Sequence, residues 1–150
     1  MNPPTDWSRL RELAQDRRDT VGQQLAEAAT LRDAARQKLE MLVDYRREYD
    51  GRLATSAVGG IDTEKLRSYR QFLANLERAI DQQTEALALA QERVVDAQAV
   101  WRGEQRQVDS FRILDERRLA AESREAGRLD QKLTDEFSSR LALQAGAGND

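Results

Sequence analysis

The spacing of apolar residues constrains this chain most, because they recur at alternating gaps of three and four over nearly its whole length. That period is typical of helices that pack along one seam. The only two prolines, Pro3 and Pro4, precede Thr5 and Asp6, and either of these can cap a helix. The sequence therefore predicts an all-α chain with long, uninterrupted helices.

A glycine-containing break divides the apolar stripe into two helices. The first stripe follows Trp7, Ala14, Val21, Ala28, Ala35, Leu42 and Tyr49 at seven-residue steps, with Leu10, Leu25, Leu31, Leu39, Tyr45 and Leu53 between them. The second follows Leu66, Leu73, Ile80, Leu87, Val94, Trp101 and Val108, interleaved with Tyr69, Leu76, Gln83, Ala90, Ala97, Glu104 and Phe111. Between them, Gly59-Gly60 reads as a chain reversal and Asp62-Thr63 as a new helix cap.

A short connection between two long helices makes them antiparallel neighbours. We therefore predict one antiparallel coiled-coil hairpin over residues 1–150. Helix one spans about 5–53, the turn about 54–61, the longer helix two about 62–142, and a disordered tail 143–150. Centring the bend near Val58 places Ala14 opposite Trp101 and Arg11 opposite Glu104. Helix two beyond Phe111 then lacks a partner helix, and we expect it to become fully helical only against something else.

The composition argues against an enzyme. Without cysteine or histidine, the chain lacks thiolate chemistry, the usual metal ligand and the usual proton shuttle. The adjacent carboxylates of Asp115-Glu116 and Asp135-Glu136 do not face one another on a helix. Gly59-Gly60 lacks the Lys and Ser/Thr of a phosphate-binding loop. We predict no catalytic residue, no cofactor, no metal and no small-molecule substrate.

Charge and hydropathy limit the kinds of partner that this chain can bind. A net charge of -3 with interspersed signs provides no basic stripe for a nucleic acid. No run of about twenty apolar residues is present, and residues 1–6 lack the regions of a signal peptide. We expect a soluble, cytoplasmic protein whose partners are proteins.

Apolar residues are in excess near the bend. The seam there is already filled by Leu66, Tyr69, Leu73, Leu76 and Ile80, and further apolar side chains flank it: Phe72 and Ala79, together with Leu42, Tyr45 and Tyr49 of helix one. These residues form either an exposed aromatic patch, of the kind that binds proteins, or ordinary packing with Phe72 folded over Leu76. The pattern leaves both alternatives open.

Two stretches that flank the bend carry a family resemblance. They are Met41-Leu42-Val43-Asp44-Tyr45-Arg46-Arg47-Glu48-Tyr49 and Tyr69-Arg70-Gln71-Phe72-Leu73 with Leu76-Glu77-Arg78-Ala79-Ile80. Supporting matches are Trp101-Arg102, Asp115-Glu116-Arg117, Asp130-Gln131-Lys132 and Asp135-Glu136-Phe137. On these residues the chain resembles the FliJ-type proteins of the flagellar type III export apparatus.

The resemblance implies a non-catalytic coiled-coil protein that serves flagellum biogenesis, motility and chemotaxis. It implies a cytoplasmic location with peripheral association to the inner-membrane export apparatus at the flagellar base. The implied partners are the hexameric export ATPase, whose pore such proteins enter, the cytoplasmic domain of the export gate, and export chaperones. The implied gate-binding residues are Leu42, Tyr45, Tyr49, Phe72, Leu76 and Ala79. The alternative is a structural homodimer, in which two hairpins pair as a four-helix bundle without an ATPase partner.

Overall fold

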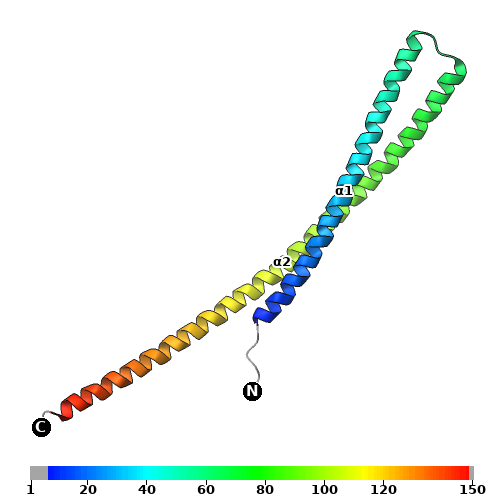
Figure 1. Cartoon of the computed structure of the whole chain (residues 1–150). Coiled ribbons are helices and arrows are strands. Elements are labelled where there is room, and N and C mark those ends of the chain that lie inside the picture. Colours follow the sequence, from blue (N-terminus) through cyan, green and yellow to red (C-terminus); the bar gives the residue numbers. More distant parts are fainter. Residues whose placement is uncertain (1–6, 149–150) are drawn as a thin grey trace. The chain divides into compact units, whose positions relative to one another are not determined.

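The computed structural model describes residues 7–148 as two long helices (Figure 1). Helix α1 spans Trp7–Val58 and helix α2 spans Thr63–Ala147. No strand occurs in the described part of the chain. At 85 residues against 52, α2 is the longer helix. The predicted fold class, two packed antiparallel helices with the second one longer, is confirmed.

The chain forms two compact units. One consists of residues 16–104, which hold the turn and the two helical arms that leave it. The other combines, among the described residues, 7–15 with 105–148, so that the start of α1 packs on the middle of α2. Each unit has its own buried residues, Leu76 and Val94 in the first and Ala14 and Val108 in the second.

The seam lies where the apolar period predicts it, except at Leu31 and Tyr45 of α1, which are both exposed. All predicted seam residues of α2 from Leu66 to Phe111 are buried or half-buried. On α1, however, Leu31 is 62% exposed and Arg32 takes the seam position. The alternating gaps of four and three residues thus run from Ala28 through Arg32 to Ala35. The aliphatic stem of Arg32 covers the seam, while its guanidinium pairs with the carboxylate of Asp33 at 3.1 Å.

The turn is shorter than predicted, because α1 continues to Val58 instead of ending near residue 53. Residues 54–58 interrupt the apolar stripe but contain no helix breaker. The helix stops only at the glycine pair, where Gly60 adopts a φ of +82° that other residues rarely reach. The carbonyl of Asp62 accepts a hydrogen bond from the amide of Leu66 at 3.0 Å, so α2 begins at the predicted cap.

The longer α1 also changes the predicted register. Trp101 packs against Gly22, with its Nε1 3.5 Å from where a Cβ would stand, and not against Ala14. Arg11 forms an ion pair with Asp115 at 3.8 Å and not with Glu104. The predicted pairing was wrong by at least one helical turn, since it placed the bend too early in the chain.

Helix α2 continues through Ala147, so residues 143–147 of the predicted disordered tail are helical. Alanine and leucine dominate this end and favour helix. Every described residue from Leu119 onward is exposed. The predicted caps Thr5 and Asp6, and residues 149–150, lie outside the described part of the chain. Neither helix, over its described length, has a stretch apolar enough to span a membrane.

Candidate protein-docking site

Four aromatic side chains gather next to the turn, within the unit of residues 16–104, and we call them the aromatic cluster: Tyr45, Tyr49, Tyr69 and Phe72. The Tyr49 ring stacks on Phe72 at 4.3 Å between centroids and meets Tyr45 at 5.2 Å and Tyr69 at 6.1 Å. Spacings of four residues on α1 and three on α2 place each pair on one helix face. The cluster therefore joins the two helices through ring contacts, which contribute about 0.5–1.5 kcal/mol per pair.

Charged side chains form a rim around the cluster. The Arg52 guanidinium lies 5.5 Å from the centre of the Tyr49 ring and donates a hydrogen bond to Glu48 at 2.9 Å. Across the helices, Arg46 pairs with Glu77 at 3.1 Å. All of these charged groups are largely exposed, so the ion pairs contribute little stability. Their effect is to surround an apolar surface with polar groups.

The six residues implied as gate-binding do not share one environment. Tyr45 is 46% exposed, and Leu42, Tyr49, Phe72 and Ala79 are half-buried. Leu76 is only 7% exposed and belongs to the core beneath them. Phe72, for which the sequence left exposed patch and ordinary packing open, stacks on Tyr49 of the other helix. The site is thus both a packed layer and a partly open surface.

The environment of Tyr49 alters its acidity. Burial raises the pKa of the Tyr49 phenol above its ordinary value of 10.0, and neighbouring Tyr45 adds to the rise while Arg52 opposes it. The phenol therefore stays neutral throughout the physiological range and presents a hydroxyl that can donate a hydrogen bond to a partner.

The surroundings of the cluster have the layout of a binding surface. Beside the cluster, an open hollow at the turn is lined by Tyr49, Ile61, Tyr69 and Phe72, with Glu64 and Lys65 at its edge. In the described residues, no group of three or more Asp or Glu side chains is placed to hold a metal ion. An apolar centre with a polar rim is the usual anatomy of a protein interface.

One buried charge escaped the sequence analysis, which considered Asp115 only as a carboxylate that does not face its neighbour Glu116. Its side chain is 11% exposed and accepts a hydrogen bond from Arg118 at 3.0 Å, with Arg11 at 3.8 Å. The sequence does contain a sign of this burial, because Asp115 lies one seven-residue step beyond the seam residue Val108. A carboxylate at a seam position needs cationic partners.

Comparison with known proteins gives a consistent result over the chain length. A family model described as "Flagellar FliJ protein" matches residues 7–147. The Flagellar FliJ protein of Salmonella typhi is 33% identical over 135 residues, covering 90% of this chain and 92% of that protein. The Flagellar FliJ protein of Escherichia coli (strain K12) is 32% identical over the same length and coverage. Since the match begins with α1 and ends with α2, the whole described hairpin is accounted for, and the chain belongs to the flagellar FliJ protein family.

Proposed function

We propose that this protein is a non-catalytic adaptor of the flagellar type III export apparatus. It links the hexameric export ATPase to the cytoplasmic domain of the export gate and assists the delivery or recycling of export chaperones. It acts in the cytoplasm, peripherally attached to the inner-membrane apparatus at the flagellar base. The observation that carries the proposal is the family match over residues 7–147.

The gate contact is assigned to the aromatic cluster and its neighbours. Tyr45, Tyr49 and Phe72 offer rigid rings at a partly open surface, with Leu42 and Ala79 beside them and Leu76 as support from beneath. In protein interfaces, the residues that contribute most of the binding energy are often aromatic and surrounded by a polar rim. The charged pairs at the rim favour a polar edge on the partner.

The ATPase contact is assigned to the exposed part of α2. Leu129, Leu133, Phe137 and Leu141 are between 50% and 64% exposed, and they recur at gaps of four. An isolated helix with such a stripe gains stability when another surface covers it. A ring of ATPase subunits that encloses the helix would cover it from all sides.

A binding assay with both partners from the same organism tests the two assignments separately. We expect the protein to capture the export ATPase and the gate domain independently. Phe137→Asp should abolish capture of the ATPase and leave the gate contact unchanged, because a charge replaces the exposed ring. Phe137→Leu is the matched control, because it keeps an apolar side chain at the same position of the stripe.

Failure of either capture would contradict the corresponding assignment. If neither partner binds and the protein sediments as a dimer at micromolar concentration, the structural homodimer replaces the adaptor.

A further inference from the structure

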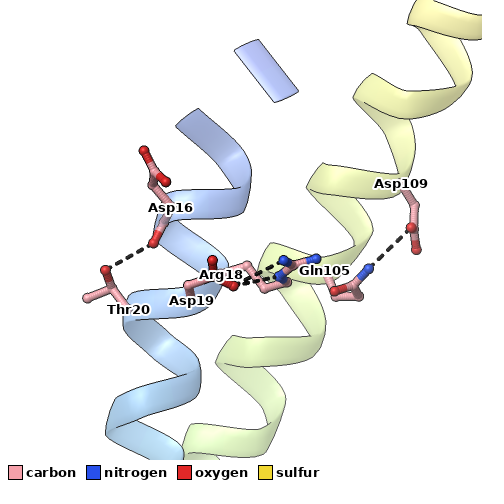
Figure 2. A network of polar contacts seen from close by, with 6 residues as sticks. All are labelled: Asp16, Arg18, Asp19, Thr20, Gln105 and Asp109. Carbon is pink, nitrogen blue, oxygen red and sulfur yellow. Dashed lines mark hydrogen bonds and ion pairs between the residues drawn. The ribbon is translucent and has the colours of Figure 1, made fainter. Parts of the chain in front are cut away.

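Gln83 makes an unusual contact for a seam residue. It is half-buried on α2, and its Nε2 donates a hydrogen bond to the backbone carbonyl of Ala35 on α1 at 3.0 Å. Many other polar contacts stay within one helix, as Figure 2 shows for Thr20 with the carbonyl of Asp16 and for Gln105 with Asp109. Ala35 carries only a methyl group, which leaves its carbonyl open to an amide from the facing helix. The bond therefore ties one particular residue of α2 to one particular residue of α1.

The apolar layers alone distinguish poorly between registers. The α1 seam of this unit contains Gly22, Ala28 and Ala35, whose small side chains accept many different neighbours. Both stripes also repeat every seven residues, so a slip by one heptad places apolar residues opposite apolar residues again. The apolar spacing is compatible with a bend centred near Val58, a register that the protein does not adopt.

We propose that Gln83 is a positioning residue that fixes the register of α1 against α2 and thereby assembles the aromatic cluster. A slip of seven residues moves one helix by about 10 Å along the other. Such a shift would separate Tyr49 from Phe72, which now stack at 4.3 Å. When the slip brings Leu42 opposite Gln83, the amide loses the Ala35 carbonyl and faces an apolar side chain, which penalises that register.

A register-setting role has a signature that a merely stabilising role lacks. A polar residue in a coiled-coil seam specifies the register at some cost in stability. Gln83→Leu should therefore leave the melting temperature unchanged or raise it, while the slipped register, with Leu42 facing the new leucine, becomes populated. Loss of register without loss of stability is the expected combination.

Cross-linking measures the register directly, because the chain has no cysteine of its own. Arg46→Cys with Glu77→Cys reports the observed register, since these side chains meet at 3.1 Å on the exposed edge of the seam. Arg46→Cys with Thr84→Cys reports the slip of seven residues. A short bifunctional maleimide applied to each full-length pair, at dilution, gives the ratio of the two registers.

We expect Gln83→Leu to lower the ratio of observed to slipped cross-link about five-fold, equivalent to about 1 kcal/mol for one partly buried hydrogen bond. Gln82→Leu, which changes the exposed neighbour, should leave the ratio unchanged. The turn also opposes slipping, so the measurement is repeated with Gly60→Ala, which makes the positive φ of the observed turn costly and so weakens the turn's hold on the register. If Gln83→Leu alters the ratio in neither background, Gln83 does not set the register.

Discussion

At the scale of single residues, exposure separates a binding side chain from a packing one. Tyr45 is 46% exposed, whereas Leu76 is 7% exposed beneath the same surface. Tyr45→Ala should weaken binding of the gate domain about thirty-fold, the equivalent of about 2 kcal/mol for an aromatic anchor, with little loss of stability. Leu76→Ala should lower the free energy of unfolding by about 2–5 kcal/mol, because it leaves a cavity in the seam.

Urea unfolding and a binding titration on the same two variants check this prediction. Val43→Ala serves as a control, because Val43 is 37% exposed and, two positions from Tyr45, points away from it on the helix. Equal loss of stability in Tyr45→Ala and Leu76→Ala would assign Tyr45 to packing. Unchanged gate binding by a stably folded Tyr45→Ala variant would remove the aromatic cluster from the gate contact.

The acidity of Tyr49 predicts a dependence of stability on alkaline pH. Because the folded pKa of Tyr49 is raised above 10.0, the folded protein keeps this proton more tightly than the unfolded chain does. This contribution to stability is fully present below the unfolded pKa and is lost as the pH rises through the folded pKa. Thermal unfolding from pH 8 upward should therefore show a decline that begins near pH 10 and is reduced in Tyr49→Phe. A wild-type decline identical to that of Tyr49→Phe would assign the effect to other groups.

At the scale of elements, the turn depends on the conformation of one glycine. Gly60 has a φ of +82°, and nothing lies within 4 Å of a Cβ added there, so the cost of a side chain is purely conformational. Gly60→Ala should lower the free energy of unfolding by about 1–2 kcal/mol. Gly59→Ala is the matched control, since Gly59 has equally open surroundings and no positive φ. Thermal denaturation of the two variants measures the difference, and equal melting temperatures would contradict it.

Helix α2 differs in stability along its length. Its contacts with α1 reach as far as Asp115, which pairs with Arg11, whereas each described residue from Leu119 onward is exposed. Backbone amides of residues 119–147 should exchange hydrogen much faster than those of residues 66–100, because an isolated helix opens readily. Addition of the export ATPase should slow exchange in residues 119–147 alone. Uniform protection along α2 in the free protein would show that its end is stabilised without a partner.

At the scale of the whole molecule, the two proposed contacts lie on separate parts of the chain. Truncation after Arg118 keeps all the buried residues, including Asp115 with its arginine partners. The shortened protein should melt at a temperature close to that of the full chain, bind the gate domain normally and fail to bind the ATPase. Circular dichroism and the same capture assay check these three outcomes. Retention of ATPase binding by the shortened protein would place that contact on the paired helices.

The sequence by itself determined the fold class, the seam of α2 and the start of α2 directly after Asp62. These features follow from local rules, namely the apolar period, the absence of internal proline and the capping residue, which act within a few residues of the chain. The same period located the aromatic residues at the candidate site. The sequence did not decide whether these residues form an exposed aromatic patch or ordinary packing, because the burial of a side chain depends on the residues that it meets from the other helix.

Only the tertiary structure decided the register and what depends on it. Repeating apolar layers with small residues such as Ala28 and Ala35 fit several registers almost equally well, so the spacing alone favoured one that the protein does not adopt. The observed register follows from the end of α1 at Val58, the positive φ of Gly60 and the bond from Gln83 to Ala35. The same long-range pairing buried Asp115 between Arg11 and Arg118 and stacked Phe72 on Tyr49. These contacts join residues far apart in the chain, and no local pattern specifies which residues will meet.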